Sequence, residues 1–304
     1  MLLGLVPAPG HAAIAPALPV RLLFTISGYT PGQPFRRPAA VALDQARRTL
    51  YVADPGDQAI VALSLQGVPG YRIEAGPQFE PISIALDRDG QVFASDRATG
   101  RIKVFGPSGT LDRELDVAEL SHTETARAGR ITLSKDGQLY CVDQANCRIL
   151  VFDSQRRLRL KFGGEGNRAG QFKVPEDVAV DRFGRIYVSD SLGTPLQVFD
   201  ASGVFLHAIG RHGEGPGDLS CPTALFVDRF DQVWVTDTNR HQVVIYDRSG
   251  WPLRTVGEFG QTPGRFFYPV GLAGDGLGRV YVAEREGQRV QVFTYDNPLD
   301  RFPR

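Results

Sequence analysis

An acidic residue recurs along this chain at a nearly constant interval, and each time it ends the same short apolar sequence. The segment GRIYVSD (184–190) returns as DQVWVTD (231–237) and as GRVYVAE (278–284). Six acids occupy this position, with one separation of 42 residues followed by four of 47. A period of this length is typical of proteins built from stacked structural repeats. The six closing acids are Asp54, Asp96, Asp143, Asp190, Asp237 and Glu284.

Each repeat contains four short apolar segments separated by turns. In five repeats the first begins with Pro and ends in Asp, as in PEDVAVD (175–181), whereas the third repeat has Ala128 and Ser134 there; the second ends in the acid. A third, such as PLQVFD (195–200), precedes a short turn, here ASG (201–203), and a fourth, such as VFLHAIG (204–210). Alternating apolar and polar residues bounded by Gly, Asp and Pro favour β-strands, and no window shows helical spacing. We therefore predict an all-β fold, a six-bladed β-propeller with four-stranded antiparallel blades.

Large side chains recur at two positions of the repeat. One position lies three residues before each closing acid, and the other lies in the third strand. Because neighbouring blades pack face to face, we interpret both as core positions rather than as a surface on which a ligand stacks. The two sets are Tyr51, Phe93, Tyr140, Tyr187, Trp234 and Tyr281, and Leu63, Phe105, Phe152, Phe199, Tyr246 and Phe293.

The sixth repeat is incomplete, because only a short tail follows its third strand at Phe293. At the other end of the chain, VRLLFTISGYTPGQPFRRP (20–38) matches the fourth strand and connecting loop of later repeats, such as 158–175. We predict that this N-terminal strand completes the last blade, which removes the exposed edge that an open ring would carry. Residues 20–304 then form a single propeller domain, preceded by a leader over residues 1–19.

The leader begins MLLGLVPAPGHAA, an apolar run that ends in small residues. It resembles the remnant of a signal peptide without its basic start, and a Pro- and Ala-rich extension with no targeting role is the alternative. The first interpretation makes the protein extracytoplasmic, either periplasmic or secreted, and the second leaves it cytoplasmic. Prolines and glycines interrupt residues 1–20, the longest uncharged stretch, so we expect no transmembrane segment.

The charges of this chain balance, with 34 Lys and Arg against 34 Asp and Glu. A chain with 42% hydrophobic and 22% charged residues is expected to fold around a core, which excludes a disordered protein. A net charge of zero gives no general attraction to nucleic acid or to anionic lipid. We expect a monomer with no DNA partner and no cofactor.

Three cysteines, Cys141, Cys147 and Cys221, lack the paired spacing of a zinc site or a disulfide framework. Cys141 stands where other repeats carry Val or Ala, so we expect it to be a small core residue. A disulfide between Cys141 and Cys147 across a hairpin is left open, because sequence does not test its geometry.

The repeat resembles that of NHL-repeat propellers. The resemblance rests on the Pro-led first strand, the YVxD second strand, the RIxVF third strand and the G-x-F-x-x-P loop of Gly170, Phe172 and Pro175, and it extends over residues 20–294. It implies the propeller fold. It does not imply one function, since such propellers include RNA readers, protein-binding modules, sensor domains and a zinc-dependent amidating lyase.

In this topology, the loops that join the second strand to the third and the fourth to the next blade lie on one face around the central channel. These loops are long, varied and charged, and binding residues concentrate on such loops. The innermost strands carry Ala40, Ser83, Arg130, Asp177, Ala224 and Gly271 at one equivalent position. Arg130 and Asp177, with Glu176 beside them, therefore predict either a charged binding spot at the channel mouth or a structural ion pair that plugs the channel. Further candidate binding residues in the loops are Arg97, Arg240, His241 and Arg285.

The closing acids with their neighbouring arginines, and a scattered set of possible metal ligands, have simpler interpretations. The acid column recurs in every repeat, so we interpret its carboxylates as turn caps that accept backbone N–H groups, and Arg101, Arg148 and Arg289 form a partial column nearby. Weak metal-ligand candidates, with no motif to join them, are His212, Cys221, Asp237 and His241. Because the histidines do not recur at equivalent positions, the ligand set of the lyase does not transfer to this chain.

The segment LDVAELSHTETARAG (115–129) is more polar than its counterparts in other repeats. We expect an irregular loop here, or a helical turn that begins at Ser121 with Glu124 in capping-box spacing.

Three functions fit this sequence. The first is a non-catalytic scaffold that binds a protein or peptide through the loop-bearing face, and the second is a metal-dependent propeller enzyme of lyase or lactonase type with its site in the channel. The third, which we favour least, is single-stranded RNA binding, because acids in the same loops offset the arginines. Those arginines are Arg36, Arg37, Arg97, Arg168, Arg240, Arg265 and Arg285, and the acids are Asp57, Glu165, Glu214, Asp218, Glu258 and Glu286.

Overall fold

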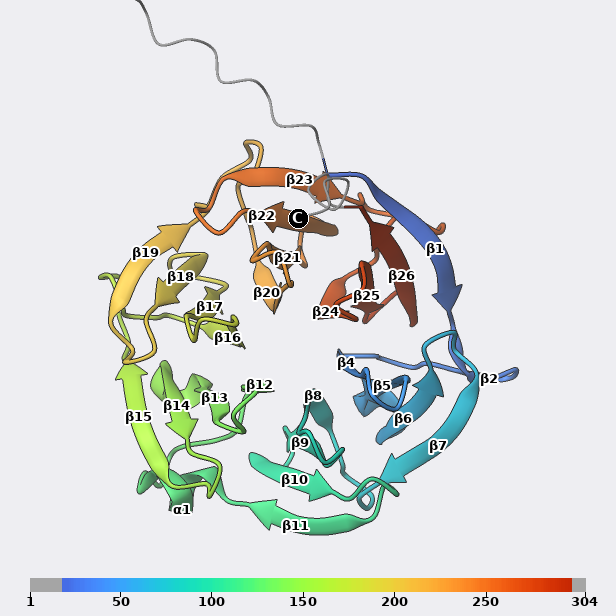
Figure 1. Cartoon of the computed structure of the whole chain (residues 1–304), viewed down its shortest axis with the longest axis horizontal. Helices are drawn as coiled ribbons and strands as arrows, with labels where there is room; N and C mark the ends of the chain where they lie inside the picture. The colour runs from blue at the N-terminus through green and yellow to red at the C-terminus, as the bar shows by residue number, and fades with distance from the viewer. Residues whose placement is uncertain (1–17, 297–304) are drawn as a thin grey trace, which may run out of the picture.

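Six four-stranded antiparallel sheets stand around a central axis like the blades of a propeller (Figure 1). The computed structural model describes residues 18–296 of the chain. In each blade the first strand of the repeat lies nearest the axis and the fourth lies at the rim. The prediction of a six-bladed β-propeller with four-stranded blades is confirmed.

The strands of blades 1 to 3 follow one another along the chain. Blade 1 contains β4 (Ala40–Asp44), β5 (Thr49–Asp54), β6 (Ala59–Ser64) and β7 (Pro69–Glu74). Blade 2 contains β8 (Pro81–Leu86), β9 (Val92–Asp96), β10 (Arg101–Phe105) and β11 (Leu111–Leu115). Blade 3 contains β12 (Ile131–Leu133), β13 (Leu139–Asp143), β14 (Arg148–Phe152) and β15 (Leu158–Gly163).

Blades 4 and 5 repeat this order, and blade 6 takes its last strand from the start of the chain. Blade 4 contains β16 (Pro175–Val180), β17 (Ile186–Asp190), β18 (Leu196–Phe199) and β19 (Phe205–Ile209). Blade 5 contains β20 (Pro222–Val227), β21 (Val233–Asp237), β22 (Gln242–Tyr246) and β23 (Pro252–Val256). Blade 6 contains β24 (Pro269–Gly274), β25 (Arg279–Glu284), β26 (Arg289–Tyr295) and β1 (Val20–Ile26).

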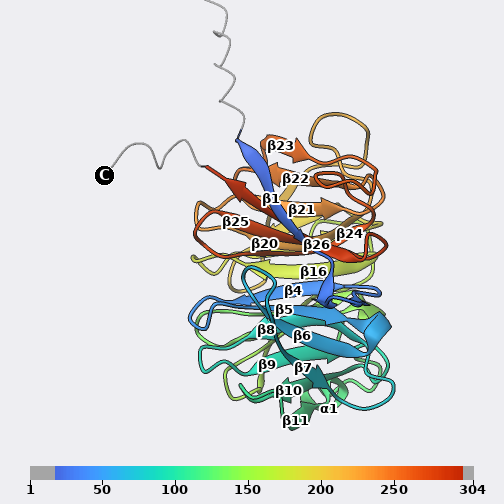
Figure 2. The same cartoon turned by 90° about the vertical axis from the view of Figure 1, so that its right-hand side faces the viewer.

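Strand β1 closes the ring. It pairs antiparallel with β26, from Val20 opposite Tyr295 to Ile26 opposite Val290, with a register shift between Leu22 and Phe24. Figure 2 shows the two strands side by side although they stand at opposite ends of the chain. The predicted closure by the N-terminal strand is confirmed, and it removes the open edge of β26.

The two columns of large side chains meet between the blades. Each of six core clusters in the described residues holds a second-strand side chain from one blade and a third-strand side chain from the next. Tyr51 of blade 1, for example, packs in the cluster of Phe105 of blade 2, and Trp234 of blade 5 in that of Phe293 of blade 6. All twelve side chains are buried, so the interpretation as core is confirmed.

The two faces of the ring differ. On one, which we call the loop-rich face, lie the loops between second and third strands and those that enter each following blade. On the other, the turn face, lie the short turns between first and second and between third and fourth strands, such as 181–184 and 200–203. Because binding residues concentrate on such loops, a functional site is expected on the loop-rich face.

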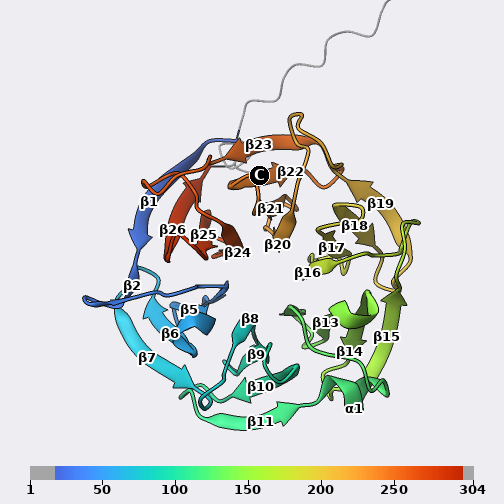
Figure 3. The same ribbon diagram turned by 180° about the vertical axis from the view of Figure 1, so that it is seen from behind.

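A small hairpin, β2 (Gly28–Thr30) with β3 (Gln33–Pro34), follows β1 and departs from the predicted plain loop. It projects from the rim of the ring beside blade 1 (Figure 3), where the Tyr29 hydroxyl donates to the carbonyl of Gly70 at 3.0 Å. Gly28 is needed there, because a Cβ at this position would lie 2.3 Å from the carbonyl oxygen of Gln33. Two short 3-10 turns, η1 (Pro55–Asp57) and η2 (Gln144–Asn146), lie in second-to-third strand loops.

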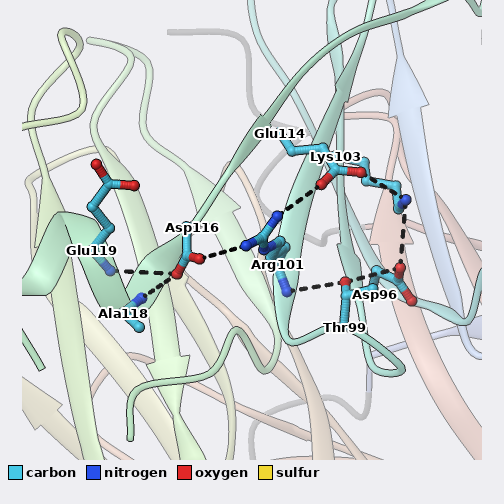
Figure 4. Close-up of polar contacts among 8 residues, drawn as sticks. All are labelled: Asp96, Thr99, Arg101, Lys103, Glu114, Asp116, Ala118 and Glu119. Atoms are coloured by element: carbon cyan, nitrogen blue, oxygen red, sulfur yellow. Dashed lines mark hydrogen bonds and ion pairs between the residues drawn. The ribbon is translucent and has the colours of Figure 1, made fainter. Parts of the chain in front are cut away.

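The polar segment after blade 2 forms a short helix, α1 (Val117–Ser121), but not with the predicted cap. Asp116 caps it, since its carboxylate accepts the N–H groups of Ala118 and Glu119 at 3.0 and 3.3 Å, and Ser121 is its last residue (Figure 4). The prediction that the turn begins at Ser121 with Glu124 is wrong. A carboxylate directly after a strand reaches the first free N–H groups of the helix, and Ser121 is too late in the segment to do so.

The described residues contain no helix long and apolar enough to cross a membrane. Most of the predicted leader, residues 1–17, and the C-terminal residues 297–304 lie outside the described part of the chain. The signal-peptide interpretation therefore stays a prediction.

Candidate functional site at the channel mouth

The closing acids hold the loops of the loop-rich face in place. The buried carboxylate of Asp190 accepts the backbone N–H groups of Lys173 and Val174 at 2.7 and 2.9 Å, in the loop that enters blade 4. It also accepts those of Leu192 and Gly193 at 3.1 and 2.8 Å, in the loop after β17. One carboxylate thus ties two loops together, which confirms the capping interpretation. Backbone N–H groups of the entering loops also donate to Asp54, Asp96, Asp143, Asp237 and Glu284.

The partial arginine column serves the same acids and forms no basic patch. Arg148 pairs with Asp143 at 2.8 Å and Arg289 with Glu284 at 2.7 Å, each inside its own blade. Arg101 turns outward instead, to Glu114 and Asp116 at 3.4 and 2.9 Å (Figure 4). These guanidinium groups neutralise carboxylates locally, and they are not available to a ligand as a group.

Arg130 crosses the central channel. It lies just before β12 of blade 3, and its Nη2 atom donates to the carbonyl oxygen of Val270 in blade 6 at 2.7 Å and to that of Ala39, beside blade 1, at 3.3 Å. Toward the turn face, the innermost strands line an open cavity of about 300 Å³, and toward the loop-rich face lies a pocket of about 270 Å³. Arg130 lines both spaces, so its side chain divides the channel.

Asp177 lies on the turn-face side of Arg130, on β16 of blade 4. Its carboxylate accepts the backbone N–H of Leu225, on β20 of blade 5, and that of its own neighbour Val178, both at 2.9 Å. Burial raises the pKa of Asp177 to about 6, although the charge of Arg130 and the two N–H donors oppose the rise. Asp177 therefore links blades 4 and 5. Burial makes the charged form of its carboxyl group unfavourable.

The predicted ion pair between Arg130 and Asp177 does not form. None of the ion pairs between described residues joins these two side chains, and each satisfies its charge on backbone groups instead. Arg130 reaches across the ring to the opposite blades, while Asp177 bonds sideways to the adjacent blade. Of these two side chains, Arg130 alone spans the channel, and carbonyl oxygens, not a carboxylate, hold it there.

The pocket on the loop-rich face, which we call the mouth pocket, gathers charge from five blades. Four arginines and two glutamates line it, around an apolar wall that includes Ile82, Val142 and Val270. Its positive excess distinguishes it from the chain as a whole, whose net charge is zero. The charged lining residues are Arg37, Glu80, Arg97, Arg130, Glu176 and Arg285.

These charges are engaged to different degrees. Arg97 pairs with Glu80 at 2.9 Å, and Glu176 accepts the hydroxyl of Ser191 at 2.9 Å. Arg285 lies over the ring of Tyr268, 5.4 Å from its centroid, and contacts Glu286 at 3.2 Å. The exposed guanidinium of Arg37 has no hydrogen bond or ion pair to any residue in the described part of the chain. The mouth pocket thus presents an unpaired cation to a ligand.

The structure brings only part of the predicted set together. Arg97, Arg130, Glu176 and Arg285 line the mouth pocket, whereas Asp177 lies beneath it. Arg240 and His241 lie farther out: Arg240 donates to the carbonyls of Asp218 and Gly213, and His241 packs among aromatic rings.

Sequence reasoning missed Glu80, and it noted Arg37 only as one of many loop arginines. Both stand directly before the proline that opens their repeat, at Pro38 and Pro81. That position lines the mouth pocket in blades 1 and 2. The residue before the proline that opens each repeat could therefore have identified Arg37 and Glu80 from the sequence.

The weak metal-ligand candidates are not gathered into a site. Nε2 of His212 contacts the carbonyl of Gly193 at 2.7 Å, and Asp237 accepts the N–H groups of Ser220 and Cys221. Nδ1 of His241 accepts the N–H of Tyr268 at 3.1 Å. The described residues contain no group of three or more His, Cys, Asp or Glu that could hold a metal ion.

The three cysteines are free thiols. Cys141 is fully buried in the cluster between blades 2 and 3, as predicted for a small core residue. Burial raises the pKa of its thiol to about 12, so it stays protonated and unreactive at neutral pH. The open possibility of a Cys141–Cys147 disulfide is not realised.

Comparison with known proteins agrees with the fold. A protein family described as a 6-bladed beta-propeller matches residues 182–255. No curated protein sequence matches the chain.

Solved structures with the same fold include proteins of different kinds. A structural-genomics protein of unknown function from Bacteroides thetaiotaomicron is 16% identical with a TM-score of 0.69, covering 92% of this chain and 76% of its own. A catalytically inactive variant of virginiamycin B lyase from Staphylococcus aureus, solved with quinupristin, is 12% identical with a TM-score of 0.63, covering 91% of this chain and 99% of its own. A streptogramin B lyase is 14% identical with a TM-score of 0.62, covering 92% of this chain and 98% of its own. At these identities the likeness shows the fold alone, and the resemblance to NHL repeats stays a prediction.

Proposed function

We propose that this protein is a non-catalytic propeller that binds an acidic segment of a protein or peptide at the mouth pocket. The observation that carries the proposal is the convergence of four arginines from blades 1, 2, 3 and 6 on one pocket with two glutamates. Positive charge inside a concave site attracts carboxylates and orients them. Because Arg130 divides the channel, a bound segment ends at this floor and does not pass through the ring.

The alternative functions find less support in the described residues. None of the histidines at 122, 207, 212 and 241 lines the mouth pocket, and the lyases share only the fold with this chain. Many loop arginines already pair with acids, as Arg36 does with Asp57 and Arg265 with Glu258, which weakens the case for RNA. The proposal includes the extracytoplasmic location and the monomeric state inferred from the sequence.

Binding of labelled peptides tests the proposal. Fluorescence anisotropy would compare fluorescein-labelled hexapeptides that contain a central Glu-Glu pair with the matched Gln-Gln peptides. We expect the acidic peptides to bind more tightly, and Arg37→Glu to weaken them about tenfold, because the substitution reverses an unpaired charge at the pocket. High salt should reduce the difference.

Arg88→Glu is the matched control. Arg88 is exposed in the β8–β9 turn on the turn face, and its guanidinium, like that of Arg37, has no hydrogen bond or ion pair to another described residue. It should leave peptide binding unchanged. Equal binding of acidic and neutral peptides, or equal loss in the two variants, would show that the mouth pocket is not the site. A stoichiometric metal ion in the purified protein would favour the enzyme instead.

A further inference from the structure

Beside the mouth pocket lies a group of rings that the repeat does not require. We call Phe259, Phe267, Tyr268 and His241 the aromatic cluster. The His241 ring lies 4.9 Å from that of Phe259 and 4.8 Å from that of Tyr268, and Phe259 and Phe267 meet edge to face at 5.5 Å. Phe259 is 61% exposed, which is unusual for so large an apolar side chain.

The loop that carries three of these rings folds like its equivalents in other blades. In the loop entering blade 6, the backbone N–H of Phe266 donates to the carbonyl of Glu258 at 2.9 Å. The carbonyl of Phe266 accepts the N–H of Gly260 at 3.0 Å. The loop entering blade 4 makes the same pair of bonds at Phe172, with the same distances. None of these three positions holds Phe, Tyr or Trp in the other two loops, so the loop does not need Phe or Tyr there in order to fold. Phe259, Phe267 and Tyr268 correspond to Glu165, Lys173 and Val174, and to His212, Ser220 and Cys221.

The backbone also departs from the repeat at Tyr268. The N–H groups of Val174 and Cys221 donate to the closing acids of their own blades at 2.9 and 3.0 Å, but that of Tyr268 donates to Nδ1 of His241 in blade 5. Tyr268 has a φ of 57°, a left-handed conformation that is costly for a bulky residue. Such strain persists where surrounding contacts enforce it, and it concentrates at binding sites.

Arg285 connects the aromatic cluster with the mouth pocket. Its guanidinium covers the Tyr268 ring at 5.4 Å while the residue lines the pocket. A ligand side chain on the cluster therefore lies next to a cation, which disfavours a cationic occupant and favours a neighbouring carboxylate. The rings themselves favour another ring in edge-to-face or offset contact.

We propose that the aromatic cluster binds an aromatic side chain of the acidic peptide, next to the residue whose carboxylate meets Arg285. This inference rests on the proposed function and specifies its partner as a segment with adjacent acidic and aromatic residues. A saccharide fits less well, because the Tyr268 hydroxyl and the Nε2–H of His241 are the few polar groups that the cluster offers to its hydroxyls.

The test compares two fluorescein-labelled hexapeptides that differ at one position, Glu-Glu-Phe against Glu-Glu-Ala in the same flanking sequence. On the unaltered protein the Phe peptide should bind about tenfold more tightly, the size of one good aromatic contact with its buried area. Phe259→Ala should abolish this preference and leave the Ala peptide unchanged. Phe183→Ala is the control, since Phe183 is also 61% exposed but lies on the turn face.

The outcomes separate the two proposals. If neither peptide binds better than its Gln-Gln counterpart, the proposed function fails. If acidic peptides bind but show no preference for Phe, or keep it in Phe259→Ala, the aromatic cluster is not part of the site although the mouth pocket is. Tighter binding of an oligogalacturonate than of either peptide, lost in Phe259→Ala, would also overturn the inference, because the cluster would then serve a saccharide.

Discussion

Nη2 of Arg130 lies 2.7 Å from the carbonyl oxygen of Val270, so a side chain of blade 3 is bonded to blade 6 on the far side of the ring. A second bond from the same atom reaches Ala39 beside blade 1. One guanidinium thereby links three blades at the axis and forms the floor of the mouth pocket. The same side chain thus links the blades and lines the pocket at which we propose binding.

Replacing Arg130 with Ala should destabilise the ring. The substitution removes the hydrogen bonds to Val270 and Ala39 and opens the channel, so we expect a loss of about 2 kcal/mol in the free energy of unfolding. Urea unfolding followed by circular dichroism measures it. Arg88→Ala, on the turn face and without a bonded partner, should change the same quantity by less than about 0.5 kcal/mol. Equal effects would show that the bonds at the axis contribute nothing.

Asp177 should make stability depend on pH. Its pKa of about 6 in the folded protein exceeds that of an unfolded Asp, about 3.9, so the folded state holds the proton more tightly. The contribution of this group is therefore full below about pH 4 and is lost as the pH rises through about 6, by about 3 kcal/mol in total.

The variant Asp177→Asn isolates this effect from that of other carboxyl groups. Asn does not titrate, so the stability of the unaltered protein minus that of the variant should fall between about pH 4 and pH 7. Urea unfolding at a series of pH values gives this difference. A difference that is constant with pH would contradict the raised pKa.

A methyl group at Gly271 should crowd the neighbouring blade and lower the stability of the ring. A Cβ there would lie 3.1 Å from Cα of Ala40 and 3.2 Å from the carbonyl oxygen of Ala39, both backbone atoms of the neighbouring blade. We expect Gly271→Ala to cost about 1–3 kcal/mol, measured as a lower urea midpoint. Gly106→Ala is the control, because the nearest atoms there belong to the side chains of Asp112 and Thr110, which can move. A harmless Gly271→Ala would mean that blades 6 and 1 are less tightly packed than described.

Asp190→Ala should lower the free energy of unfolding more than the removal of an acid on the turn face does. It leaves four N–H donors of two loops without their acceptor, and we expect a loss of about 3 kcal/mol. Asp200→Ala removes an exposed turn cap with two backbone N–H groups and should cost about 1 kcal/mol. Thermal unfolding of both variants gives the comparison, and similar melting temperatures would refute it.

The repeat made the architecture predictable. Six acids with four separations of 47 residues specify equivalent units, and the match of 20–38 to later repeats identifies the closing strand. Equivalence also explains why the roles of Tyr187 and Asp190 could be inferred, since a feature shared by all blades must serve the blade itself.

The site was predicted only in part, because it arises where the repeat is broken. Arg130 and Asp177 stand at equivalent positions in adjacent blades, which suggested an ion pair, but side chains on the inner strands can also reach opposite blades or adjacent backbone. The direction that each takes depends on which backbone groups the closed ring brings within reach, carbonyl oxygens for Arg130 and N–H groups for Asp177. Likewise, the bond from Tyr268 to His241 joins two blades through a backbone conformation that no sequence spacing specifies.

Closure by β1 has a consequence for how this ring can be attached to anything else. Val20 and Tyr295 are register partners, and Tyr295 packs against Phe230 of the turn at 228–231 on the turn face. The described part of the chain therefore begins and ends at neighbouring points on the rim, toward the turn face. A surface linkage made at that part of the rim would leave the mouth pocket, on the opposite face, open to the solution, which suits sensor chips and affinity resins.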